Sequence, residues 1–354
     1  MARQHASLVG AFSLACLLGI AERARPVQES TAIEVAENKK QELDDPRPFA
    51  GVHTFALSAD ASLLAYSHTV SQGKEFHEVI VLRNLKTGET KHILRGHRGP
   101  VIALAFSTDG KTLLSPCLSR ADGQELALDI IRWDVGTGKV AKTDSLEPGG
   151  ILALSANGKF LVTRPTEEQP IAKVWNLETG KAVSLTGHAK TLGLASISAD
   201  GTKIATTGDY PTYLIVWDAA SGKKLWSHKL DRGKGHTEGG IAFAPDGKTL
   251  VVTGHRESLF FDVATGDSTA HITDPGYADR VKFSPDGKLV AFAGGTVKLW
   301  SVESKRFVAV LKPSGKPGER IGTGIPFFSA DSRTVVTAWT IGQVRIWEVP
   351  KLER

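Results

Sequence analysis

The stretch VWNLETG at residues 174–180 decides the fold of this 354-residue chain, because the same pattern recurs along it. Each copy ends a hydrophobic strand, carries Trp or a substitute for Trp, and then enters a tight turn. The Trp-like positions are Arg83, Trp133, Trp175, Trp217, Phe261, Trp300 and Trp347. Successive copies therefore lie 50, 42, 42, 44, 39 and 47 residues apart. A period of about 40 to 45 residues, built from short strands, indicates repeated small sheets and not a helical solenoid.

The units also share their beginning. An alternating strand such as Val101–Phe106 leads into a turn of the Ser-x-Asp-Gly type, and a second apolar strand such as Thr112–Ser115 follows. The last turn position needs a residue that tolerates positive φ, which favours Gly. Ser58–Ala61 and Ser329–Ser332 lack this Gly, so we expect the least well-formed turns there. Four antiparallel strands in each of seven units predict an all-β, seven-bladed β-propeller over residues 49–354.

The last unit is short of one strand. Only Glu348–Arg354 follow Trp347, and an open sheet edge promotes aggregation. We therefore expect the segment Thr31–Ala36 to supply a ring-closing strand to the seventh blade. On that interpretation, deletion of residues 22–40 lowers the melting temperature sharply.

The N-terminal residues differ from the rest of the chain. A basic start and sixteen uncharged residues, Ala6–Ala21, predict a signal peptide over residues 1–21, with an uncleaved anchor or a mis-assigned start as alternatives. Export to the periplasm or the extracellular space follows, with no stable membrane span after cleavage. A lipid anchor at Cys16 is not expected, because the surrounding residues match a lipoprotein box poorly. Residues 22–48 form a polar linker.

Composition and motifs argue against several functions. The net charge of +5 is not gathered into a dense basic stripe, so nucleic-acid binding is unsupported. No nucleophile elbow, zinc helix, phosphate loop or dinucleotide motif is present, and we predict no catalytic residue, metal or cofactor. After cleavage Cys117 would be the one remaining cysteine, so no disulfide is expected and a role as an apolar filler is favoured. His53, His68, His77 and His255 fall near strand ends, but no matching set of carboxylates supports a metal site.

These motifs carry a family resemblance. The Trp-Asp or Trp-Asn pairs, the Ser-Pro-Asp-Gly-like turns and the Gly-His pairs ending at His97, His188 and His236 resemble those of WD-repeat β-propellers, here a divergent, exported bacterial type. The resemblance implies a hydrogen-bonded network of His, a Ser or Thr of the second strand, Trp and Asp in each blade. The Asp position holds Ala127, Gln169 and Pro211 in blades two to four. We therefore expect these blades to depend more on packing than on that network.

The resemblance implies a non-catalytic scaffold that presents its loop-rich face to a protein or peptide, as a monomeric ring. Connections between second and third strands are long at His68–Glu78, Cys117–Leu126 and Arg164–Pro170, which makes one rim uneven. The candidate interaction residues are Trp339, Arg164, Arg120, Tyr210, Arg256, Arg280, Arg320 and His68. Trp339 is the expected anchor, since Trp, Tyr and Arg dominate binding hot spots; packing over the central channel is the alternative. A second hypothesis is an envelope enzyme or small-ligand-binding propeller that uses this channel.

Overall fold

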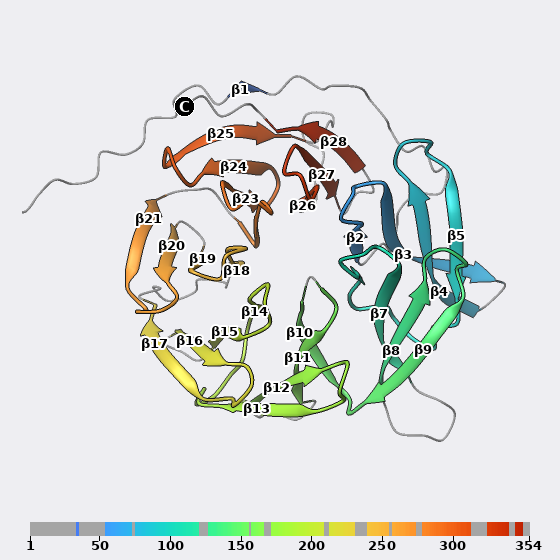
Figure 1. The fold of residues 1–354 in the computed structure, drawn as a ribbon, viewed down its shortest axis with the longest axis horizontal. Coiled ribbons are helices and arrows are strands. Elements are labelled where there is room, and N and C mark those ends of the chain that lie inside the picture. The colour runs from blue at the N-terminus through green and yellow to red at the C-terminus, as the bar shows by residue number, and fades with distance from the viewer. Residues whose placement is uncertain are drawn as a thin grey trace, which may run out of the picture. The chain divides into compact units, whose positions relative to one another are not determined.

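Seven antiparallel sheets follow one another around a ring in the computed structural model of the protein (Figure 1). The structure describes residues 33–34, 54–72, 75–119, 127–155, 157–165, 171–208, 212–230, 239–254, 257–273, 278–312, 324–339 and 344–349. All of them belong to the larger of two compact units, Ile33–Arg354. These residues form strands and turns, and they include no helix long and apolar enough to cross a membrane. The predicted all-β, seven-bladed propeller is confirmed.

The first four blades are meanders in which chain order is also the order from the centre of the ring outward (Figure 1). Blade one contains β2 (Phe55–Leu57), β3 (Leu63–Gln72), β4 (Glu75–Asn84) and β5 (Thr90–Arg95). Blade two contains β6 (Ala105–Phe106), β7 (Thr112–Ser119), β8 (Ala127–Asp134) and β9 (Val140–Leu146). Blade three contains β10 (Gly149–Leu154), β11 (Phe160–Pro165), β12 (Ile171–Asn176) and β13 (Ala182–Thr186). Blade four contains β14 (Ala195–Ile197), β15 (Lys203–Gly208), β16 (Tyr213–Asp218) and β17 (Lys224–Lys229).

The remaining blades follow the same plan. Blade five contains β18 (Ile241–Phe243), β19 (Thr249–Thr253), β20 (Glu257–Asp262) and β21 (Ser268–Thr273). Blade six contains β22 (Arg280–Phe283), β23 (Leu289–Ala293), β24 (Val297–Ser301) and β25 (Arg306–Leu311). Blade seven contains β26 (Gly324–Phe328), β27 (Thr334–Trp339) and β28 (Val344–Glu348), which make a three-stranded sheet within the described residues.

The N-terminal strand lies in the expected segment but on a different blade. β1 (Ile33–Glu34) falls within Thr31–Ala36, and it pairs in parallel with β25, Ile33 opposite Ala309. This finding corrects the expected position, which was the outer edge of blade seven. The physical reason is that β25 is also an outermost strand, so its free edge offers the same unpaired backbone groups.

Side-chain packing closes the ring. The buried apolar side chains of the described residues form seven clusters, one at each junction between neighbouring blades. At the junction of blades seven and one, Phe327 packs in one cluster with Phe55 and Tyr66. The Ala330 N–H donates to Ala59 O at 2.9 Å across the same junction. Closure therefore needs no exchanged strand.

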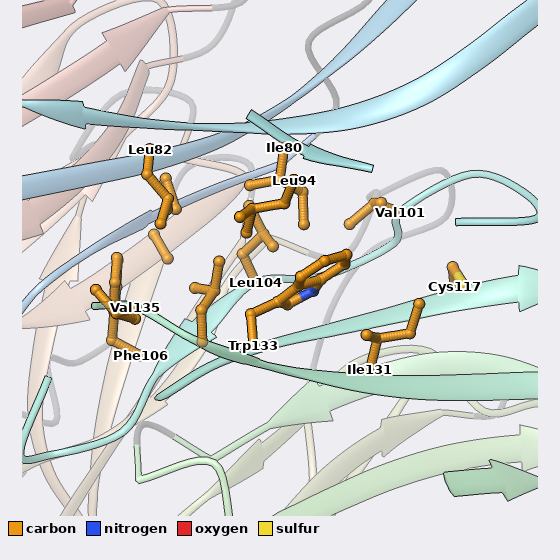
Figure 2. Close-up of a cluster of buried hydrophobic side chains, with 13 residues drawn as sticks. Ile80, Leu82, Leu94, Val101, Leu104, Phe106, Cys117, Ile131, Trp133 and Val135 are labelled. Atoms are coloured by element: carbon orange, nitrogen blue, oxygen red, sulfur yellow. The ribbon is translucent and has the colours of Figure 1, made fainter. Parts of the chain in front are cut away.

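The Trp position of each unit lies at the junction with the preceding blade. Trp133 is 2% exposed and packs with Ile80 and Leu94 of blade one (Figure 2). Its Nε1–H donates to Ser115 Oγ at 2.7 Å, and His97 Nε2 lies 2.8 Å from the same oxygen. Apolar packing and a polar contact thus fix the indole together.

Other blades keep parts of this network. In blade four, Trp217 Nε1–H donates to Thr206 Oγ1 at 2.8 Å, and His188 Nε2 lies 2.8 Å from that oxygen. Trp175 and Trp347 donate to Thr163 Oγ1 and Thr337 Oγ1 at 3.0 and 2.7 Å. The contact between the indole and a hydroxyl of the second strand is thus kept in these blades. The expectation that they depend more on packing than on the full network stays a prediction. His236 lies outside the described residues.

The turns between first and second strands share one geometry. Ser107 Oγ donates to Asp109 Oδ1 at 2.6 Å and accepts from the Thr112 N–H at 2.9 Å. In the two turns without Gly, Ala61 and Ser332 take φ of 55° and 59°, in the left-handed region. Their closing hydrogen bonds have the usual length of 2.9 Å, so the expected poor formation is not seen. These residues instead carry a backbone strain of about 1 kcal/mol.

The residue after the Trp position explains the second recurrent turn. Asp134 Oδ1 accepts from both the N–H and the hydroxyl of Thr137 at 2.7 Å, which lowers the pKa of Asp134. Asn176 Oδ1 accepts from the Glu178 and Thr179 N–H groups at 3.0 Å in the same way. Asp and Asn recur there because either side chain can cap the turn.

Candidate functional site

One side of the ring, the loop face, is the side on which first strands begin and second strands end. The residue pairs Gly149–Pro165, Arg280–Ala293 and Gly324–Trp339 mark it in blades three, six and seven. The structure therefore places Arg164, Arg280 and Trp339 on one face. Only the backbone of Trp339 is described, so its role as an anchor stays a prediction.

Arg164 connects two blades on the loop face. Its exposed side chain lies across Gly150, where an added Cβ would come within 3.0 Å of Arg164 Nε. Nη1 donates to Leu192 O of blade four at 3.5 Å. The guanidinium is thus held in place while its remaining donors face solvent. Such a group suits a partner that offers hydrogen-bond acceptors.

The other candidate residues divide into two groups. Arg280 is exposed at the start of β22, and His68 is half-buried in β3, opposite Val79. Four candidates, Arg120, Tyr210, Arg256 and Arg320, lie outside the described residues.

The long connection of blade one is strand rather than loop over most of its length, whereas that of blade two is described only at its first residues, 117–119. β3 and β4 pair from Leu63–Asn84 to Gln72–Glu75, whereas β2 pairs with β3 only from Leu64 to Tyr66. The residues beyond β2, His68–Gln72 with Glu75–Glu78, form a two-stranded segment that we call the blade-one ribbon. The expected loop His68–Glu78 is corrected accordingly. Its alternation of polar and apolar residues, for example Thr69-Val-Ser, is the signal that favours a strand.

Sequence reasoning missed Lys282, the neighbour of Arg280 on β22. Lys282 Nζ lies 4.6 Å from the centroid of the Phe327 ring. Its side chain keeps solvent contact, yet desolvation by the surrounding protein, followed by the charge of Arg280, lowers the pKa of Lys282 to about 8. Alignment of the units on the turn Ser could have found it. The equivalent positions hold Ala56, Ala105, Ala153, Ser196, Ala242 and Phe327.

A polar groove of about 650 Å³ lies between β9 of blade two and the β12–β13 turn of blade three. Arg132 forms an ion pair with Asp144 and donates to Leu177 O at 2.7 Å, so it joins the two blades beneath the groove. Lys173 forms an ion pair with Glu147 at its edge. These charges compensate one another, which favours a structural role for the groove.

The described residues contain no group of three or more His, Cys, Asp or Glu side chains that could hold a metal ion. Cys117 is fully buried at the junction of blades one and two. Burial, followed by the nearby Asp129 charge, raises the pKa of this thiol to about 11. The thiol is therefore a poor nucleophile, in agreement with the predicted role as an apolar filler.

The ring of repeated sheets defines a seven-bladed β-propeller, and its Trp–hydroxyl–His contacts resemble those of WD-repeat proteins. Residues 88–123 match the family model described as "WD domain, G-beta repeat". This segment runs from the end of blade one into blade two.

Three relatives illustrate the similarity along a larger part of the chain. Apoptotic protease-activating factor 1 of Rattus norvegicus is 26% identical over 282 residues, which are 72% of this chain and 20% of that protein. Autophagy-related protein 16 of Arabidopsis thaliana is 25% identical over 264 residues, 70% of this chain and 48% of that protein. Small ribosomal subunit protein RACK1y of Oryza sativa subsp. japonica is 28% identical over 180 residues, 50% of this chain and 40% of that protein. The chain thus spans less than half the length of each relative.

Proposed function

We propose that the protein is a non-catalytic interaction platform that binds a protein or peptide on its loop face. Similarity to WD-repeat proteins supports this role, because propellers of this kind offer a rigid ring on which partners dock.

The blade-one ribbon is the observation that carries the proposal. The pairing of β3 with the first strand, β2, ends near Ser67, whose N–H donates to Thr54 O at 3.1 Å. Beyond that point the ribbon continues with edges that no first or fourth strand covers in the described pairing. A two-stranded ribbon is marginally stable alone, and uncovered strand edges invite pairing with another chain. A partner on the loop face would cover these edges.

Side chains on the same face supply further contacts. Arg164 is fixed against Gly150 and keeps free donors, and Trp339 ends β27 where blade seven opens onto the face. Within the proposal, Trp339 provides apolar contact area and Arg164 provides directed hydrogen bonds. This division of roles is typical of binding hot spots.

The test compares variants of the two sides of the ring. Partner proteins are captured from extract of the source organism with the parent protein, then purified, and their affinity is measured by calorimetry. Trp339→Ala with Arg164→Ala is expected to weaken binding about 30-fold or more, the loss of one hot spot. Leu225→Ala is the matched control, because Leu225 is 46% exposed on the outer strand β17, away from the loop face.

Folding of each variant is checked by its thermal transition. If the double variant binds the partner as tightly as the parent does, or if Leu225→Ala loses as much affinity as the double variant, the binding site does not lie on the loop face. If no protein binds the folded parent specifically, the platform proposal fails.

We also propose that residues 1–21 direct export, although they lie outside the described residues. The basis is the short apolar run after a basic start. Intact-mass measurement of protein from the source cells tests this, with a new N-terminus at Glu22 as the expected result. An N-terminus at Met1 would contradict cleavage.

A further inference from the structure

The innermost strands of the ring have an unusual charge distribution. The first strands β2, β6, β10, β14, β18, β22 and β26 lie nearest the centre (Figure 1). Their sequences are FAL, AF, GGILAL, ASI, IAF, RVKF and GIPFF. Arg280 and Lys282 are therefore the only charged residues in these seven strands. The innermost layer carries two positive charges and no negative charge.

Both cations leave β22 on the same side. Burial alternates along the strand, with Arg280 and Lys282 exposed and Val281 and Phe283 buried at the junction with blade five. Phe327 of blade seven lies under the Lys282 ammonium at 4.6 Å. Arg280 begins β22 at the loop face, Lys282 follows two residues later on the same side of the strand, and the charge of Arg280 acts on Lys282.

One acidic residue, Asp279, directly precedes the pair, and it takes part in an interaction. No ion pair joins Arg280 or Lys282 to an acidic side chain among the residues that the structure describes. The strands that contact β22 are β18, β19, β23 and β26, and none of them contains a titratable residue. The charged group nearest to Lys282 on β22 and these strands is therefore Arg280, on β22 itself. Two like charges in this position are costly unless an anion joins them.

We propose that Arg280 and Lys282 form a binding site for an oxyanion, a carboxylate or a phosphate, near the centre of the ring on the loop face. A guanidinium can hold two oxygens of such a group in parallel hydrogen bonds, and the ammonium adds a second positive charge. The unit alignment supports a specific role, since four of the other blades carry Ala where blade six carries Lys282. This inference goes beyond the proposed platform function and does not require a protein partner.

The site has a pH signature. The pKa of Lys282 is lowered to about 8 in the free protein, so part of its charge is lost near that pH. A bound oxyanion stabilises the ammonium and raises this pKa toward its ordinary value. Affinity is therefore highest below pH 8 and falls as the pH rises above 8, because binding then requires uptake of a proton.

Calorimetric titration of the full chain with inorganic phosphate and with succinate at pH 7 tests the site. Lys282→Ala and Arg280→Gln are each expected to weaken binding about tenfold or more. Lys282→Ala introduces the residue of four other blades, so it is expected to fold. Lys288→Ala is the matched control, because it removes the same charge from the exposed turn after β22 and should leave affinity unchanged.

The two probes distinguish the sources of the oxyanion. Saturable binding of phosphate alone assigns a phosphate site, and binding of succinate assigns a carboxylate site. Succinate keeps its charge above pH 7, so its affinity should fall through pH 8 in the parent and stay level in Lys282→Ala. Equal affinities in all variants, or no saturable binding of either probe, would overturn the proposal. Partner capture on the loop face would remain a separate result.

Discussion

The junction between blades one and two differs from the junction that closes the ring. At the first, Trp133 fills the space between blades, and Ser115 and His97 hold its indole. At the closing junction Arg83 occupies the Trp position, and its Nε–H donates back to Gly88 O at 2.8 Å. Tyr66 occupies in blade one the position that Ser115 occupies in blade two. Each lies two residues after the second-strand residue that pairs with the Trp position.

The aromatic volume has thus moved from the third strand to the first and second strands. Phe55 and Tyr66 lie with ring centroids 6.4 Å apart and pack with Phe327 of blade seven. The comparison shows that a propeller junction needs a filled interior, whereas the strand that supplies the aromatic ring can vary. Where the contacts of Trp with a hydroxyl and His are present, they fix the orientation of the indole.

The largest expected effect is the difference in stability cost between substitutions at Trp133 and at Arg83. Trp133→Ala should lower the free energy of unfolding by about 3–5 kcal/mol, the cost of emptying a buried indole site. Arg83→Ala should cost less than about 1 kcal/mol, because Arg83 is half-exposed and its Nε–H donates to Gly88 O of its own turn. Urea unfolding followed by circular dichroism measures both. Similar costs would show that Arg83 stabilises its junction as much as Trp133 stabilises the junction of blades one and two.

The second effect is a pH dependence confined to the junction with His97. Burial lowers the pKa of His97 to about 4, below its ordinary value of 6.5. The unfolded chain therefore takes up the proton first as the pH falls, so stability is complete above about pH 6.5 and declines toward pH 4. The decline should be roughly 2–3 kcal/mol, reduced somewhat by the solvent contact of the ring.

His97→Gln should make this decline smaller in urea unfolding measured from pH 7.5 to pH 4. Carboxylates with a lowered pKa, such as Asp134, account for the part that remains near pH 4. Phe327→Leu at the closing junction is the matched control, because it lowers stability without touching His97. An unchanged pH profile in His97→Gln would show that other groups cause the decline.

The repeat predicted the blades because each turn and each Trp position is a local signal. Ser107-Thr-Asp-Gly110 and Trp133-Asp134 specify their own hydrogen bonds, and these are found. The position of β1 could not be predicted, since β25 and β28 are both outermost strands among the described residues and two residues carry little preference. Lys282 was missed because a single Lys on a short strand is ordinary in isolation. Its meaning appears only when the seven first strands are seen together around the centre.

A smaller effect compares the first turn of blade one, beside the closing junction, with the equivalent turn of blade two. Ala61→Gly should raise stability by up to about 1 kcal/mol, because Ala61 holds φ at 55°. Gly110→Ala should lower stability by a similar amount in blade two, where φ is 69° and an added Cβ would meet nothing within 4 Å. Thermal melting of the two variants and the parent shows whether each substitution raises or lowers stability. Destabilisation by Ala61→Gly would show that the Ala side chain contributes more than its backbone strain costs.

The smallest expected effect concerns the N-terminal strand. Deletion of residues 22–40 removes β1, which pairs at only two positions, Ile33 with Ala309 and Glu34 with Val310. The few hydrogen bonds lost are largely offset by the regained freedom of the segment and of its partner edge. The free energy of unfolding should therefore change by less than about 1 kcal/mol, and the melting temperature only slightly. Phe327→Ala, which empties part of the closing cluster, should cost about 3 kcal/mol beside it. A sharp fall in the melting temperature after the deletion, with a mild effect of Phe327→Ala, would show that strand pairing and not side-chain packing closes the ring.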